Sequence, residues 1–349
     1  MTISNPSKPS LKTLGIAKRQ AVKDSVQITP LIDGNYLPLL IKATVEGVDL
    51  VAWAANNQEL IKKHLLKHGG ILFRNFQVKE VAEFEQFIKL VAGDLLEYRD
   101  RSSPRSAIQG KIYTSTDHPA NQKILLHSEN SYAANWPLKI FFYCVTPAQQ
   151  GGETPIADIR KIYQRISPEV IEKFAQKQVM YVRNFGDGFG LPWQTVFQTT
   201  NPEKVEEFCY QNSIKFEWKG ENKLRTYSRR PAIAKHPITG ENVWFNHALF
   251  FHISSLEMAI RESLLAEFAE EDLPHNTYYG DGSSIEPEVL EEIHSVYQQE
   301  TVIFPWLTGD ILMLDNMLTA HGRQPFSGNR KVVVGMAEPY TGENINIFN

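Results

Sequence analysis

Residues 309–336 read GDILMLDNMLTAHGRQPFSGNRKVVVGM. Two runs rich in β-forming residues, 311–314 and 331–336, have a turn cluster between them at Ser327-Gly328-Asn329. Short apolar runs with turn residues between them are typical of strands in a β-sandwich or barrel. The same texture begins near residue 111 and recurs at residues 124–126, 140–145, 179–182, 243–245 and 302–304. The sequence therefore predicts a mainly β fold with helical insertions, an α+β chain.

Helices and domain limits are predicted from periodicity and composition. Apolar residues at helical spacing predict helices at residues 56–68, 81–91, 168–176 and 256–271. The short apolar run at 71–73, which follows two glycines, predicts a strand. Residues 1–25 are polar and predict a flexible arm. We expect a single domain over residues 26–349 with a helical or lid insertion around 181–300. Residues 181–230, which include the aromatic residues Phe185, Phe189, Trp193 and Phe197, could form either a lid or ordinary core packing.

Composition narrows the class of protein. The net charge is −4 with no long basic block, so nothing favours a nucleic-acid partner. The two cysteines, Cys144 and Cys209, are far apart, which excludes a disulfide framework and fits a reducing cytoplasm. The sequence contains no secretion signal and no apolar run approaching the roughly 18 residues of a membrane span. A homo-oligomer is left open.

His127-Ser128-Glu129 places a histidine and a carboxylate two residues apart at the end of an apolar run. If the strand persists that far, residues i and i+2 face the same side and can reach one ion. His321, between the two runs of the opening stretch, is the best third ligand. Two histidines and one carboxylate hold ferrous iron and leave positions open for chemistry. A His-x-Glu pair on its own often occurs by chance, so this interpretation needs further support.

That support comes from a cation and a hydroxyl suited to a dicarboxylate co-substrate. Arg330 lies nine residues after His321, at the start of a run that would return antiparallel to the strand before it. A bidentate arginine suits a carboxylate, and the hydroxyl of Thr154, in Gly151-Gly152-Glu153-Thr154-Pro155, could supplement it. Taken alone, Arg330 would be read as a solvated cation at a strand end. Asn246 and His247 are candidate pocket residues, with core packing an equal alternative.

These motifs resemble the taurine dioxygenase-like (TauD/TfdA) family of Fe(II)/2-oxoglutarate enzymes, over roughly residues 70 to 340. Other blocks resemble the branch typified by the syringomycin-biosynthesis aspartyl hydroxylase, namely residues 98–105, 113–116, 236–241, 244–246 and 279–282. The resemblance implies a double-stranded β-helix, a cupin-like jelly roll, with the metal at one mouth. It also implies Fe(II), 2-oxoglutarate and O2, with Thr154 and Arg330 on the distal carboxylate of 2-oxoglutarate. Arg323 could hold a substrate or co-substrate carboxylate, and neighbouring Lys331 competes with Arg330 for the inward position.

The resemblance also bears on the reaction. Halogenating relatives lack the carboxylate ligand that Glu129 supplies here, so hydroxylation is favoured, with desaturation or cyclisation as alternatives. The branch implies an amino-acid-like small molecule as substrate, either free or tethered to a peptidyl carrier protein in natural-product biosynthesis. Two other classes are weighed: a zinc hydrolase with the same ligands, which needs no arginine for a dicarboxylate, and a non-catalytic β-barrel binding protein.

Overall fold

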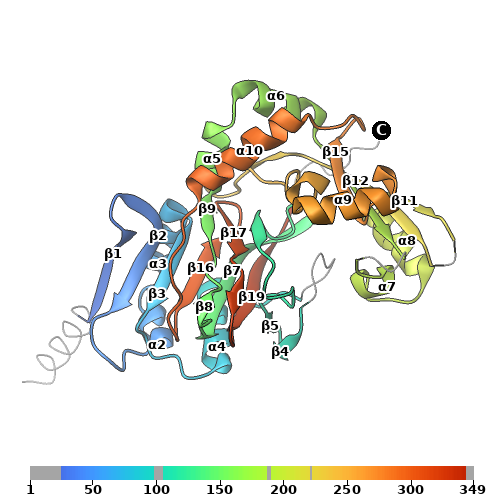
Figure 1. Cartoon of the computed structure of the whole chain (residues 1–349). Coiled ribbons are helices and arrows are strands. Elements are labelled where there is room, and N and C mark those ends of the chain that lie inside the picture. Colours follow the sequence, from blue (N-terminus) through green and yellow to red (C-terminus); the bar gives the residue numbers. More distant parts are fainter. Residues whose placement is uncertain (1–24, 98–104, 187–189, 221, 343–349) are drawn as a thin grey trace, which may run out of the picture.

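An eight-stranded sheet forms the main wall of the molecule (Figure 1). The computed structural model describes residues 25–97, 105–186, 190–220 and 222–342. The predicted arm therefore lies outside the described residues except for Ser25, and so does most of the block at 98–105. The strands of the sheet, in spatial order, are β1 (Val26–Ile32), β2 (Asn35–Ala43), β3 (Gly70–Arg74), β16 (Ile311–Asp315), β7 (Asn135–Thr146), β19 (Lys331–Thr341), β5 (Ile112–Thr114) and β4 (Ala107–Gln109). All neighbouring pairs are antiparallel except β2 and β3.

Alternation along the central strands divides their side chains between two cores. In β16, Ile311 and Met313 face one core, while Leu312 and Leu314 face the other. The strands β7 and β19 divide their side chains in the same way. A strand that is buried on both faces has a nearly continuous run of apolar residues. This is why these strands could be predicted from the sequence.

Three helices cover the outer face of this sheet (Figure 1). They are α2 (Leu50–Ala55), α3 (Gln58–His68) and α4 (Val81–Ala92). In α4, Phe84, Phe87 and Ile88 are buried at helical spacing against the sheet. Helix α3 ends at Gly69, whose left-handed backbone caps it. The predictions of helices at 56–68 and 81–91 and of a strand at 71–73 are confirmed, with small shifts of the ends.

A smaller sheet faces the inner side of the main sheet. It consists of β6 (Ile124–His127), β17 (Thr319–Arg323) and β9 (Ile156–Asp158), with the short pair β8 (Gln150–Gly151) and β18 (Phe326–Ser327) beside it. The two sheets enclose an apolar core and form the jelly roll, so the predicted fold class is confirmed.

One expectation about the opening stretch is wrong. The strands β16 and β19 do not form an antiparallel pair, because each pairs antiparallel with β7, which lies between them. Between them the chain crosses to the smaller sheet and forms β17. The apolar run at 302–304 is not a strand either, since only Val302 makes an isolated bridge, to Ile156.

Helices close the far side of the smaller sheet, toward the top of Figure 1. Ala320 and Leu318 of the β17 region pack there in a core shared with α5 (Ile159–Arg165), α6 (Pro168–Lys177), α10 (Pro287–Glu300) and the hairpin β13 (Ile233–Lys235) and β14 (Asn242–Trp244). Because alternate residues of β17 point outward into this core, His321 and Arg323 point the other way, into the barrel.

The region around 181–300 contains a sheet as well as helices. Its strands lie in the order β11 (Ile214–Trp218), β12 (Leu224–Arg230), β10 (Val179–Phe185) and β15 (His275–Tyr279), with α7 (Trp193–Val196), α8 (Pro202–Gln211), α9 (Met258–Glu267) and the 3-10 turns η1 (Ile253–Ser255) and η2 (Glu270–Asp272). Helix α9 is shorter than the predicted 256–271. Phe185 and Trp193 are buried in a local core on which Phe197 packs, so these aromatics are core residues, while Phe189 lies outside the described residues.

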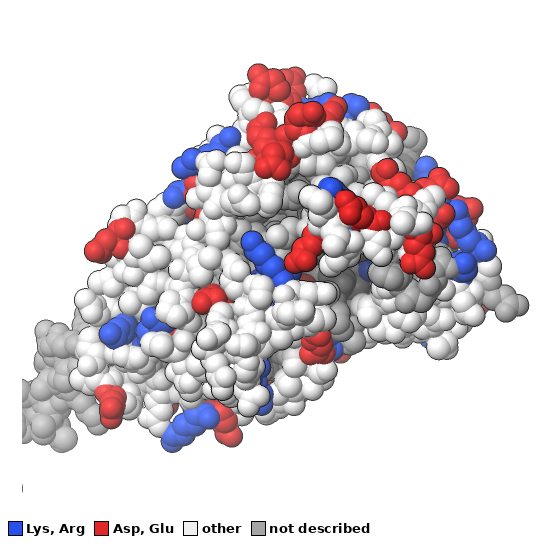
Figure 2. All heavy atoms as spheres, in the orientation of Figure 1, with Lys and Arg blue, Asp and Glu red and all other residues white. Residues whose placement is uncertain are grey.

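Charges are mixed on the face shown in Figure 2. Lys and Arg side chains are scattered there, and acidic side chains gather over the helices at the top of the view. Among the described residues, no helix has the length and apolar character that crossing a membrane requires.

Candidate active site

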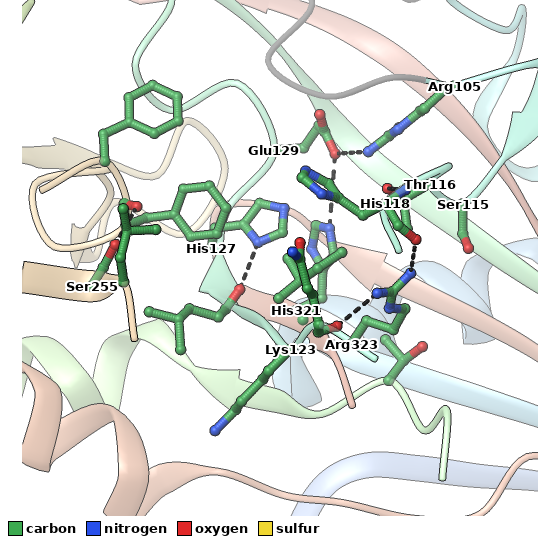
Figure 3. Close-up of a pocket in the computed structure, with 18 of the residues that line it drawn as sticks. Arg105, Ser115, Thr116, His118, Lys123, His127, Glu129, Ser255, His321 and Arg323 are labelled. Carbon is green, nitrogen blue, oxygen red and sulfur yellow. Dashed lines mark hydrogen bonds and ion pairs between the residues drawn. The ribbon is translucent and has the colours of Figure 1, made fainter. Parts of the chain in front are cut away.

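Two histidines and a glutamate converge at the mouth of the barrel, where β6 lies beside β17 (Figure 3). His127, the last residue of β6, is directly opposite His321 in the register of the two strands. The centroids of the two rings are 4.5 Å apart. Glu129 Oε2 lies 3.8 Å from His321 Nε2, and one ligand atom from each of the three side chains falls within 4.8 Å of the others. The three predicted ligands are therefore brought together.

The way in which Glu129 reaches this position differs from the expectation. Strand β6 ends at His127, so alternation along a strand does not place Glu129. The chain turns immediately after it, where Asn130 has a left-handed backbone with φ of 58°. Glu129 therefore reaches the cluster from a turn.

Both histidines are suited to bind a metal as neutral imidazoles. His127 Nδ1–H donates to the carbonyl oxygen of Leu125 at 2.9 Å, which leaves the Nε2 lone pair available. Burial lowers the pKa of His127, although the Glu129 charge opposes this, and burial also lowers the pKa of His321 well below its usual value. Two imidazole nitrogens and one carboxylate oxygen are the donor set that suits Fe(II), so the residues present fit the metal.

Arg105 is a partner of Glu129 that the sequence analysis missed. Its Nη2 donates to Glu129 Oε2 at 2.7 Å, and both side chains are almost fully buried. Arg105 ends one of the blocks quoted for the family resemblance, but a single arginine 24 residues before its partner carries no spacing signal. The pair neutralises a carboxylate that would otherwise be buried alone.

The predicted co-substrate residues lie on the same cavity. Arg330 Nε donates to the carbonyl oxygen of Gly152 at 2.8 Å, and its Nη1 donates to Ser115 Oγ at 3.2 Å. A Cβ on Gly152 would lie 2.9 Å from Arg330 Cδ, so a glycine is needed for this close approach, and its φ of 74° also favours glycine. Lys331 is exposed, which resolves the competition in favour of Arg330 as the inward cation.

Thr154 is buried on the cavity wall with its hydroxyl oriented by a tryptophan. Trp306 Nε1–H donates to Thr154 Oγ1 at 3.1 Å. Because the indole can only donate, the hydroxyl accepts this bond and keeps its own proton to donate to another group. Neither Trp306 nor Ser115 was singled out as a functional residue from the sequence, since their contacts are made between segments far apart in the chain.

The cavity has a volume of about 240 Å³, and most of the charged residues on its wall are cations. Burial, followed by the charge of Arg323, lowers the pKa of Arg330 to about 10, so this arginine is charged near neutral pH. Arg183 and Lys123 also line the wall, and Glu129 is the one carboxylate among the described wall residues. In Figure 3 the Lys123 side chain points away from the metal ligands. An anionic molecule is therefore favoured in this cavity.

The three candidate substrate residues lie in different places. Arg323 lines the cavity, but its guanidinium donates to the backbone carbonyls of His118 and Gln122 at 2.9 and 2.7 Å and also to that of Pro119, so it holds a loop. Asn246 bonds to the backbone of Ala232 and Ala248.

His247 packs behind the site. Its ring centroid is 5.7 Å from that of His127, and its Nδ1 lies 2.5 Å from Ser131 Oγ. Neither Asn246 nor His247 is among the residues of the cavity wall. Of the two alternatives left open for Asn246 and His247, the structure favours core packing, because both are buried behind the cavity wall rather than on it.

The rest of the wall comes from segments to which the sequence analysis gave no role. His275 of β15 and Arg183 of β10 are register partners in the four-stranded sheet of residues 179–279, and both line the cavity. Aromatic and apolar side chains close the side of the cavity next to η1: Phe250, Phe251 and Leu256. The polar Ser255 also lines this side (Figure 3).

Two histidines and a carboxylate that leave coordination positions open are the ligand set of non-haem Fe(II) oxygenases. A jelly roll with this set at its mouth therefore points to that class of enzyme. Residues 33–336 match the family model described as taurine catabolism dioxygenase TauD, TfdA family. The chain belongs to this family. It is therefore an Fe(II)/2-oxoglutarate-dependent dioxygenase that uses O2.

Relatives and solved structures agree with this assignment. The chain is 38% identical to the dapdiamide synthesis protein DdaC of Enterobacter agglomerans over 315 residues, which cover 90% of this chain and 95% of that protein. It is 27% identical to a clavaminate synthase-like protein of Arabidopsis thaliana, over 79% of this chain and 85% of that protein. The crystal structure of PvcB from Pseudomonas aeruginosa matches with a TM-score of 0.54 at 16% identity, over 89% of this chain and 91% of that chain, and shows the shared fold. The resemblance to the syringomycin branch stays a prediction.

Proposed function

We propose that His127, Glu129 and His321 hold Fe(II), and that Arg330 and Thr154 bind the distal carboxylate of 2-oxoglutarate. The observation that carries this proposal is the juxtaposition of the three candidate ligands with a half-buried arginine, Arg330, on one cavity wall. Arg330 offers guanidinium protons to a carboxylate, and Thr154 adds the hydroxyl proton that its bond from Trp306 leaves available. A zinc hydrolase would have no use for this second set of residues.

The reaction we propose is hydroxylation of an unactivated C–H bond in an amino acid or in an aminoacyl group on a carrier protein. When bound, iron supplies the oxidising chemistry: one oxygen atom of O2 enters the product and the other enters succinate as 2-oxoglutarate loses CO2. The chain's own residues position the reactants and exclude water, with Phe250 and Leu256 forming the apolar side of the cavity. Arg183 on the cavity wall suits a substrate that carries a carboxylate.

Support for an amino-acid-derived substrate comes from the relative DdaC, whose name places it in dapdiamide synthesis. Glu129 fills the coordination position that halogenating relatives leave for halide, which favours hydroxylation. Mass spectrometry of the product separates the outcomes, since hydroxylation adds one oxygen atom, whereas desaturation or cyclisation removes two hydrogens.

The test is O2-dependent succinate release, screened over free amino acids and over the same amino acids loaded on a peptidyl carrier protein. We expect succinate and a substrate product in equal amounts for one member of the screen. Free amino acids that turn over as fast as their carrier-bound forms would remove the tethered alternative. No succinate above the O2-free control with any substrate, in protein that holds iron, would contradict the proposed reaction.

A further inference from the structure

Glu129 is the ligand whose position the strands do not explain. It lies outside the strands that the structure describes, because β6 ends two residues earlier at His127. The backbone of a residue in a turn lacks the regular hydrogen bonds that fix a residue within a sheet. A metal ligand must nevertheless be placed accurately. Some other contact must therefore fix the backbone of Glu129.

That contact is made by the side chain of Asn316, the residue that follows β16. Asn316 Oδ1 accepts the backbone N–H of Glu129 at 2.8 Å, and Asn316 Nδ2 donates to the backbone carbonyl of Glu129 at 2.9 Å. The second Nδ2 proton is donated to the carbonyl of Pro137, also at 2.9 Å. The amide therefore bonds both polar groups of the Glu129 backbone, as a neighbouring strand would, from a residue 187 positions away.

Asn316 is itself held firmly. Its side chain is completely buried, and its backbone N–H donates to the carbonyl of Leu138 at 2.9 Å. The preceding residue, Asp315, accepts from Lys139 Nζ at 2.9 Å and lies 3.3 Å from His236 Nε2. His236 Nδ1 accepts the backbone N–H of Thr239, so its proton is on Nε2 and points at Asp315.

We propose that Asn316 is the positioning residue for Glu129, and that it sets the affinity of the site for its metal. The proposal rests on the proposed role of Glu129 as a metal ligand. Without the amide, a buried N–H and a buried carbonyl of Glu129 lose their partners, and the turn relaxes away from the two histidines. Removing residues that orient metal ligands typically weakens metal binding by about 10- to 100-fold.

The experiment is an anaerobic titration of Fe(II) in competition with a chromophoric chelator, on the full chain. Asn316→Asp keeps the size of the side chain and can still accept from Glu129, but it loses both donors and opposes two carbonyls with a carboxylate. We expect its Fe(II) affinity to fall by about 10- to 100-fold. The matched control is Asn276→Asp, since Asn276 is also buried and accepts the backbone N–H of Ile253 but lies on β15. The control should bind Fe(II) as the wild type does.

A double-mutant cycle separates positioning from general damage. If Asn316 acts through Glu129, Asn316→Asp should have little further effect on Fe(II) affinity in a Glu129→Ala background. Equal fold-losses in both backgrounds would overturn the proposal. Wild-type protein that fails to bind Fe(II) would instead overturn the proposed function, so the two failures are distinguishable.

A measurement on the wild type covers the case in which the variants do not fold. Hydrogen exchange of the iron-bound protein reports directly on the Glu129 amide. We expect this amide to be protected as well as the amides of neighbouring strands, although it lies in a turn. Exchange as fast as in an exposed loop would contradict the proposal.

Discussion

At the scale of the residue, the environment of each cation decides what it can do. Arg330 and Lys331 are adjacent and both basic, but only Arg330 faces the cavity, where Gly152 makes room for it. Lys331 is exposed and does not line the cavity. Strand alternation predicts that only one of these two neighbours points inward. The sequence analysis preferred Arg330 because its guanidinium can bind a carboxylate with two hydrogen bonds.

Replacing Arg330 with methionine should weaken 2-oxoglutarate binding selectively. The change removes the charged donors and keeps much of the side-chain volume, and hydrogen bonds to charged groups typically contribute about 1.5–3 kcal/mol, or roughly 10- to 150-fold in affinity. Calorimetric titration of 2-oxoglutarate into the metal-loaded protein measures the loss. Lys331→Met is the control and should bind 2-oxoglutarate normally; equal losses in both variants would show that Arg330 has no special role.

Another prediction at this scale concerns pH and His275. Burial, helped by the charge of Arg183, lowers the pKa of His275 to about 4 in the folded chain, against about 6.5 for an unfolded histidine. Between these two values the unfolded chain binds more protons than the folded chain, so the free energy of unfolding falls as the pH falls from about 6.5 toward 4.

Urea unfolding at several pH values across this window tests the His275 prediction. His275→Asn should reduce the pH dependence of the unfolding free energy by up to about 1.4 kcal/mol per pH unit. His252, whose pKa burial also lowers to about 4, should keep the remaining dependence in the variant. A slope unchanged from wild type would show that His275 titrates alike in both states.

At the scale of the element, the contact between β6 and β17 assembles the site. His127 and His321 are partners because the two strands approach closely, and Gly322 permits this approach. A Cβ on Gly322 would lie 2.6 Å from the carbonyl oxygen of Ile124, closer than packing allows. Strand β17 could not be predicted from its residues, because TAHGR has no apolar run; it is a strand because β6 and β9 pair with it.

Gly322→Ala should therefore push β6 away from β17 and separate the two histidines. We expect a loss of roughly 1–3 kcal/mol in the free energy of unfolding, the usual effect of overpacking, together with weaker Fe(II) binding. Gly335→Ala is the matched control, since its Cβ would meet only side-chain ends, with Ile88 Cδ1 at 2.5 Å, on the face away from the metal ligands. Normal Fe(II) binding by folded Gly322→Ala would contradict the role of this contact.

At the scale of the whole molecule, the sequence predicted what is local and missed what depends on distant contacts. Doubly buried strands such as β16 and β19 and the amphipathic helices were visible as patterns. The candidate ligands His127, Glu129 and His321 and the cation Arg330 could be proposed from the sequence because their residue types, taken together, suit iron and a dicarboxylate, and the structure places all four on one cavity. The parallel relation of β16 to β19, the ion pair of Arg105 with Glu129, and the bond from Trp306 to Thr154 are set by tertiary packing, which one sequence does not display.

The central claim is that one cavity holds Fe(II) on His127, Glu129 and His321 and presents it to 2-oxoglutarate anchored by Arg330. Anaerobic addition of Fe(II) and then 2-oxoglutarate, followed by visible absorption, tests it most directly. We predict a weak metal-to-ligand charge-transfer band that appears only when both are present and is abolished by His127→Ala. Zinc binding with no such band in the wild-type protein would contradict the claim.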